Sequence, residues 1–255
     1  MVDLDAIKRY HKRVDKRLGR RGKTVEGSRF DWEEQDHPRD EDGKFTSGGG
    51  SGGSEKAKDA PKPRGATPKF KKSESADDFK KGFSSLRSRM KADVRWRVSD
   101  DYSVDDYKKM DKYVNENGST FALHGTDIVS VAANAEKNDR GRDILADAVE
   151  AGGNKLDAYA GIYGFYSKCG FEPVSWTEWD DEYANKDWLE ANGFTKAQWD
   201  SMKVKPKDYE LKVKREPIVF FKYTGKVNKM SLDDFMKSTK PKSYDDAYAE
   251  RDKKL

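Results

Sequence analysis

The stretch Asp127–Trp176 decides the fold predicted for this chain. It reads DIVSVAAN (127–134), AEKNDRGRDILADAVEAGGNKLDAYAG (135–161) and IYGFYSKCGFEPVSW (162–176). Between apolar runs typical of strands, Ile144, Leu145, Ala148 and Val149 recur at helical spacing. The pattern predicts strand, loop, helix, strand, short helix and strand in that order, which is the alternation of an α/β fold.

Further elements are expected on both sides of this stretch. Serine at 75 and at 103 suits a helix N-cap, and alternating apolar residues predict strands. The elements expected upstream are a helix from Ser75 to about Ala92, a strand at 94–98 (VRWRV), a helix from Ser103 to about Gly118, and a strand at 119–124 (STFALH) in a hairpin with 127–134. Those expected downstream are helices near 187–191 and 195–202, a buried strand at 218–223 (IVFFKY), and helices near 231–236 and 244–252.

The composition divides the chain into a folded part and a solvated part. Hydrophobic residues make up only 34% of it and charged residues 38%, so part of the chain is expected to lack a packed core. The predicted organisation is a basic amphipathic arm at 1–23, a disordered linker at 24–75, a folded domain at 76–225 and a helical tail at 226–255. The arm has nine lysines and arginines against three aspartates, which favours either docking on nucleic acid or an acidic protein, or a solvated helix.

Several classes of protein are disfavoured. Cys169 is the one cysteine, so no disulfide within the chain is expected. His11, His37 and His124 are too far apart in sequence for zinc-ligand spacing, and no metal site is predicted. There is no apolar run long enough for a membrane span and no signal-peptide pattern, so neither membrane association nor secretion is expected.

The segment FYSKCGFEPVSW (165–176), together with the order of the expected elements, resembles the GNAT superfamily of acyl-CoA-dependent N-acetyltransferases. The resemblance covers about Ala92 to Gly225. It implies a mixed, mostly antiparallel central sheet flanked by helices, an α/β (α+β) fold, here preceded by a disordered N-terminal region. It further implies acetyl-CoA as co-substrate and an amine as acceptor.

The resemblance assigns the cofactor to the loop and helix start that follow the strand at 127–134. The pyrophosphate would lie on Asn138, Asp139, Arg140, Gly141 and Arg142, because the free amides at a helix start bind anions. The thioester carbonyl would be held by a backbone amide near Val131–Ala133. The family pattern is Arg or Gln, two residues, Gly, one residue, then Gly or Ala. This sequence departs from it, because Gly141 stands one place late and Asp143 occupies a small-residue position. An ordinary charged helix start explains the same residues.

Two catalytic candidates follow. In the family, the tyrosine of the late motif protonates the departing CoA thiolate, which here assigns the general acid to Tyr166. A core aromatic residue beside Phe165 and Phe171 is the competing interpretation. Glu178 follows the next expected strand and is the candidate for the acceptor side, although acidic loops are usually only solvated.

The segment HPRDEDGKFTSGG (37–49) resembles a short segment of bacteriophage structural and head-associated proteins. A charged linker with a turn at Asp42-Gly43 explains it equally well. Two main functions therefore remain: a phage-encoded acyltransferase, or a non-catalytic GNAT-like module of a virion protein. A third, a nucleic-acid-modifying enzyme, rests only on the basic arm and the phage context. The expected location is the host cytoplasm or the phage virion. The expected partners are acetyl-CoA and, through the basic arm, a phage structural protein or nucleic acid.

Overall fold

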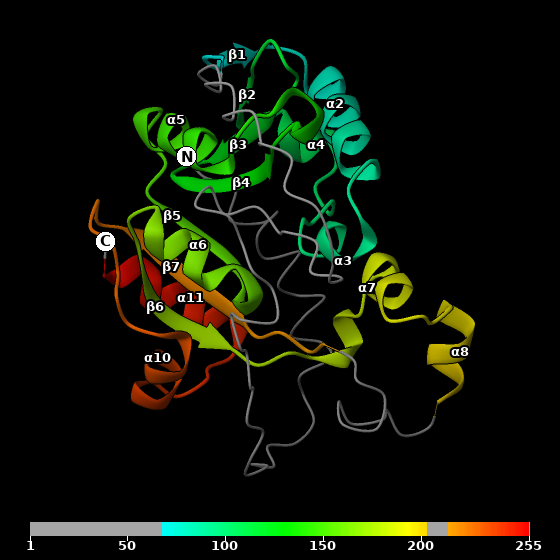
Figure 1. Cartoon of the computed structure of the whole chain (residues 1–255), viewed down its shortest axis with the longest axis vertical. Coiled ribbons are helices and arrows are strands. Elements are labelled where there is room, and N and C mark those ends of the chain that lie inside the picture. The colour runs from blue at the N-terminus through cyan, green and yellow to red at the C-terminus, as the bar shows by residue number, and fades with distance from the viewer. Residues whose placement is uncertain (1–67, 203–213, 255) are drawn as a thin grey trace, which may run out of the picture. The chain divides into compact units, whose positions relative to one another are not determined.

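The computed structural model describes residues 68–202 and 214–254 (Figure 1). The arm predicted at 1–23 and most of the linker predicted at 24–75 lie outside the described residues. The end of that linker prediction is wrong, since Lys71–Ser73 form a strand, β1. Lys71 pairs with Val114 of the next strand, so ordered structure begins before the predicted start at Ser75.

Seven strands form one sheet in the order β1-β2-β3-β4-β5-β7-β6. The remaining strands are β2 (Asp111–Val114), β3 (Thr120–His124), β4 (Asp127–Ala132), β5 (Lys155–Tyr159), β6 (Phe171–Thr177) and β7 (Ile218–Tyr223). Every neighbouring pair is antiparallel except β4 and β5, which are parallel. The prediction of a mixed, mostly antiparallel sheet flanked by helices is confirmed.

The helices of the described residues mostly begin at a capping side chain, such as Ser75 or Ser103. They are α2 (Ala76–Ser88), α3 (Ala92–Arg95), α4 (Val104–Tyr107), α5 (Gly141–Glu150), α6 (Tyr163–Lys168), α7 (Lys186–Ala191), α8 (Lys196–Ser201), α10 (Leu232–Ser238) and α11 (Tyr244–Lys253), with 3₁₀ turns η2 (Ala135–Lys137), η3 (Ala160–Ile162) and η4 (Asp181–Tyr183). Figure 1 shows α2 and α4 beside β2–β4, and α6 and α11 beside β5–β7.

Neighbouring side chains of β7 contact helices on opposite faces of the sheet. Phe221 packs against Tyr163 of α6, with ring centroids 5.7 Å apart, whereas Phe220 packs against Tyr244 of α11 at 5.0 Å. Successive side chains of a strand point to opposite faces, so α6 and α11 cover opposite faces of β7. Phe235 of α10 joins the α6 side, so the segment predicted as a helical tail contributes to the core.

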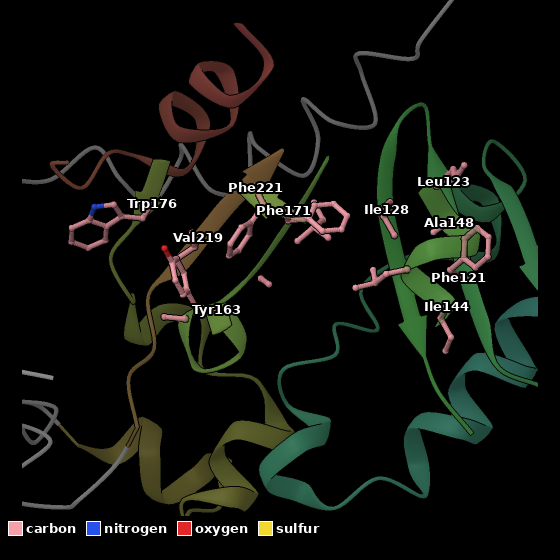
Figure 2. Packing of buried hydrophobic residues seen from close by; sticks show 14 of the residues in the cluster. Phe121, Leu123, Ile128, Ile144, Ala148, Tyr163, Phe171, Trp176, Val219 and Phe221 are labelled. Carbon is pink, nitrogen blue, oxygen red and sulfur yellow. The ribbon is translucent and has the colours of Figure 1, made fainter. Parts of the chain in front are cut away.

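The main core runs along the face of the sheet covered by α5 and α6. Figure 2 shows Phe121, Ile128 and Ile144 in one part of it, and Tyr163 and Phe221 in another. All five side chains belong to one cluster. The core is therefore continuous across the boundary between β4 and β5.

Two predicted elements are wrong. Residues 94–98 were expected to form a strand, but α3 ends at Arg95, and Trp96 is buried among other tryptophans. The alternation of basic and apolar residues in VRWRV arises because Arg95 and Arg97, on either side of Trp96, bind different carboxylates. Arg95 Nε lies 2.9 Å from Oδ1 of Asp187. This is a contact between residues far apart in sequence, which a local pattern does not reveal.

The helix predicted from Ser103 to Gly118 is also wrong beyond its first turn. Helix α4 ends at Tyr107, and β2 begins at Asp111. Gly118 has φ 82°, and its amide bonds to the carbonyl of Asn115 at 2.9 Å. The pair Asn117-Gly118 therefore lies in a tight turn that joins β2 and β3 as a hairpin. The helical spacing of Tyr107 and Met110 arises because both pack in the smaller core under α2.

Candidate functional site

Strands β4 and β5 separate soon after they begin. Asp127↔Lys155 is the one partner pair of their parallel ladder. Strand β4 is also irregular along its edge with β3. Val129 pairs with Ala122 and Ala132 pairs with Thr120, so β4 uses one residue more than β3 between these two pairs. An extra residue of this kind is a β-bulge, which bends its strand. The bulge explains why β4 turns away from β5.

The bulge is centred on Ser130, which sequence reasoning missed. Ser130 has φ 54°, in the left-handed region that a residue other than glycine adopts only at a cost. Its Oγ lies 2.7 Å from the Tyr107 hydroxyl, and its carbonyl accepts a hydrogen bond from Thr120 Oγ1 at 3.1 Å. These contacts hold the bend in place. A glycine or asparagine at this position would have indicated it, whereas serine does not.

The buried Tyr107 gives the bend a pH dependence. Burial raises the pKa of Tyr107 from 10.0 to about 12. A raised tyrosine pKa favours folding below pH 10, and this contribution is lost as the pH rises from 10 through 12. Tyr107→Phe is therefore expected to flatten the fall in the free energy of unfolding over that range, measured by urea denaturation at stepped pH. Ser130→Ala, which removes the same hydrogen bond but keeps the phenol, is the control and should retain the fall. Identical slopes for Tyr107→Phe and wild type would contradict this assignment.

Helix α5 begins beside α6. A Cβ built on Gly141 would lie 3.0 Å from Cζ of Phe165, so Gly141 allows close packing between the two helices. The first backbone hydrogen bonds of α5 run from the amides of Asp143 and Ile144 to the Arg140 carbonyl. The amides of Gly141 and Arg142 precede them, at the end of a helix where the general chemistry of free amides suits an anion. The Arg142 side chain is exposed at this end.

The loop before α5 is held by its own contacts. Asp139 is buried, and its carboxylate accepts hydrogen bonds from Asn115 Nδ2 at 2.8 Å, Asn117 Nδ2 at 2.6 Å and Ser119 Oγ at 2.5 Å. The Asp139 amide also bonds to the Asn134 carbonyl at 3.2 Å, so neither the side chain nor the amide of Asp139 is available for the predicted cofactor contact. Asn138 is exposed, with φ 59°.

The remaining predicted loop residues are only partly available to a ligand. Arg140 pairs with Asp143, with Nε 2.9 Å from Oδ2, which explains the acidic residue at 143 that departs from the family pattern. Val131 and Ala133 are half-buried and pack against the main core. Since β4 ends at Ala132, Val131 lies within the strand and Ala133 just after it.

Tyr166 lies on α6, on the aromatic surface next to the start of α5. Its ring centroid is 5.3 Å from Phe165, 6.0 Å from Phe171 and 5.5 Å from Phe221. Burial, and secondarily the charge of Asp157, raise the pKa of Tyr166, so its hydroxyl stays protonated at neutral pH. The core interpretation therefore holds for the ring, and the raised pKa makes the phenol a weaker proton donor than an exposed tyrosine.

Glu178 is not brought together with Tyr166. It is exposed just beyond the end of β6. Thr177 pairs with Ile218 of β7, whereas Tyr166 packs on Phe221, and the three residue steps from Ile218 to Phe221 span about 10 Å. Cys169 is not an activated nucleophile, because burial raises the pKa of its thiol more than nearby Arg142 lowers it.

The described residues lack two further features that would indicate a function. They contain no group of three or more His, Cys, Asp or Glu side chains placed to hold a metal ion. Within 68–202 and 214–254, no helix is long and apolar enough to cross a membrane. Comparisons with protein-family models, curated proteins and solved structures found no match to this chain.

Proposed function

We propose that this chain carries a GNAT-like acyltransferase domain that transfers an acetyl group from acetyl-CoA to an amine. The observation that carries the proposal is the divergence of the parallel strands β4 and β5 at the Ser130 bulge, with α5 following β4 directly. A diverging parallel pair leaves backbone groups of β4 without partners on β5. Such groups suit an extended amide-bearing ligand, as the pantetheine arm of CoA is.

The neighbouring groups fit the rest of such a cofactor. The amides of Gly141 and Arg142 and the exposed Arg142 guanidinium suit a pyrophosphate. Because α5 packs on Phe165, the start of α5 lies close to Tyr166 on α6. A cofactor bound by its pyrophosphate at α5 would extend its thioester along β4 towards α6.

The proposed reaction is direct transfer. The neutral amine nitrogen attacks the thioester carbonyl carbon, the developing oxyanion is held by an amide near Val131–Ala133, and the C–S bond breaks. Tyr166 donates its proton to the departing sulfur, and the proton lost by the amine passes to solvent. Glu178 lies beyond the end of β6, away from Tyr166, so it would take that proton only through a bridging water.

A second function is favoured by the state of the cofactor loop. Asp139 is engaged by three side chains of the β2–β3 turn, and Arg140 is paired with Asp143, so these charged side chains of the loop already bind other groups of the protein. A domain that has kept the fold without the cofactor would show the same pairing. The alternative is a non-catalytic GNAT-like module of a phage virion or head-associated protein.

Calorimetric titration of the full chain with acetyl-CoA tests the first function. We expect saturable binding with Kd between about 1 µM and about 1 mM. Arg142→Ala should weaken it about tenfold, since a charge-assisted contact to phosphate is lost. Arg89→Ala is the control, because Arg89 is exposed and pairs with Glu136. Absence of binding at millimolar acetyl-CoA would exclude the enzyme and favour the alternative.

A further inference from the structure

The loop between β7 and α10 displays apolar side chains to solvent. Among the described residues, the exposed large hydrophobic side chains are Tyr223 at 37%, Val227 at 60% and Met230 at 47%. All three fall within eight consecutive residues. Exposed apolar side chains scattered singly are normal, whereas a group on one segment indicates a contact surface.

The loop is built as a fixed structure. The amides of Thr224 and Gly225 bond to the Gly170 carbonyl at 2.9 and 3.2 Å, and the Asn228 amide bonds to the Ser167 carbonyl at 3.1 Å. The Tyr163 hydroxyl donates to the Met230 carbonyl at 3.1 Å. These bonds anchor the backbone of the loop on α6 and on the residue before β6. The Val227 side chain points to solvent and takes no part in the core. A surface that is ordered in advance loses little entropy on binding.

Charges of both signs flank these apolar side chains. Lys226 and Lys229 are exposed within the loop, and Asp233 and Asp234 are exposed in the first turn of α10. Phe235 faces the core, so Asp233, two positions earlier on the helix, points away from it. The two lysines and two carboxylates cancel, which disfavours a nucleic acid or an anionic lipid as the occupant.

We propose that this surface, Tyr223–Asp234, pairs with the same surface of a second copy of the chain. In a twofold dimer every contact occurs twice: where one residue of the first copy touches a second residue of the other copy, the same two residues also touch with the copies exchanged. Val227 and Met230 then form the apolar centre, and Lys229 of each copy meets Asp233 of the other. Like charges are separated and opposite charges meet, so the patch is complementary to itself. The proposal is independent of the acyltransferase activity.

The patch is small, so the dimer is expected to be weak and to depend on concentration. Sedimentation velocity of the full chain, from about 1 µM to about 500 µM, should show a monomer–dimer equilibrium. Val227→Glu, an exposed change that leaves the core intact, should remain monomeric throughout. A wild type that is monomeric over the whole range overturns the proposal and assigns the loop to another partner. A Val227→Glu variant that still dimerises overturns it as well.

Charge reversal tests the pairing itself. Lys229→Glu alone and Asp233→Lys alone should each be monomeric, because each places like charges opposite one another. An equimolar mixture of the two variants should dimerise, since both reciprocal contacts are again between opposite charges. A mixture that stays monomeric, under conditions where wild type dimerises, overturns the assignment of Lys229 and Asp233.

Discussion

Replacing Arg251 by alanine is expected to lower the free energy of unfolding by about 3–5 kcal/mol. The Arg251 side chain is 0% exposed, and its Nη2 lies 2.8 Å from Oδ1 of Asp127, which is 10% exposed. Its guanidinium also lies over the Tyr248 ring, 4.2 Å from the centroid. Removing Arg251 leaves the buried Asp127 carboxylate with only the Lys155 ammonium, 3.5 Å away, to offset its charge, and this weaker compensation accounts for most of the loss.

The place of this ion pair in the fold makes the effect larger than that of a surface contact. Asp127 begins β4 and pairs with Lys155, the first residue of β5, while Arg251 lies on α11. The Tyr248 hydroxyl donates to Asp127 Oδ2 at 2.6 Å from the same helix. Helix α11 therefore joins β4 and β5 where they begin, before they separate.

Urea denaturation measures the loss, with Lys254→Ala as the matched control on α11. Lys254 pairs with Glu250 at the surface, so its removal is expected to cost no more than about 0.5 kcal/mol. The same experiment on Arg251→Met and Asp127→Asn, singly and together, gives the coupling energy. A loss below about 1 kcal/mol for Arg251→Ala would show that α11 does not hold this end of the sheet.

Tyr166→Phe is expected to lower kcat for acetyl transfer by about 10²–10⁴-fold, with the affinity for acetyl-CoA unchanged. The substitution keeps the ring that packs on Phe165, Phe171 and Phe221 and removes only the hydroxyl, so the fold is retained. A transition-state proton transfer lost in this way lowers kcat and kcat/KM equally.

The measurement is steady-state transfer from acetyl-CoA to a panel of amines, beside a binding titration of the same variant. Tyr163→Phe is the control. Tyr163 lies on the same helix, and its hydroxyl donates to the Met230 carbonyl, which gives it a structural role. Equal turnover for Tyr166→Phe and wild type would remove Tyr166 from the mechanism and leave it as a core residue.

The parts of the fold that local patterns predict are those in which one face of an element is buried. Helix α5 and strands β5, β6 and β7 lie close to their expected positions, because Ile144, Leu145 and Phe221 are buried at the spacing of their element. The pattern failed around α3 and α4. There, Trp96 belongs to a cluster with Trp188 and Trp199 from the segment between β6 and β7, and an Asn-Gly turn overrides a helical spacing.

The candidate site was predicted less completely than the fold. Arg142 and Tyr166 could be proposed from the sequence, because a helix start and an aromatic motif are visible along the chain. The engagement of Asp139 was not visible, since its three donors lie some twenty residues earlier, in the β2–β3 turn.

The sequence by itself determined the order and kind of most elements from β3 onward, and the resemblance to the GNAT superfamily added the expectation of a mixed, mostly antiparallel sheet flanked by helices. Periodic burial of side chains is written into the local sequence, which is why these elements were predictable. Only the tertiary structure decided that β4 separates from β5. That separation depends on a serine in a left-handed conformation held by Tyr107, whereas the contact of Arg251 with Asp127 holds the two strands together where they begin. Both are contacts between distant residues, and such contacts exist only once the register of the sheet is set.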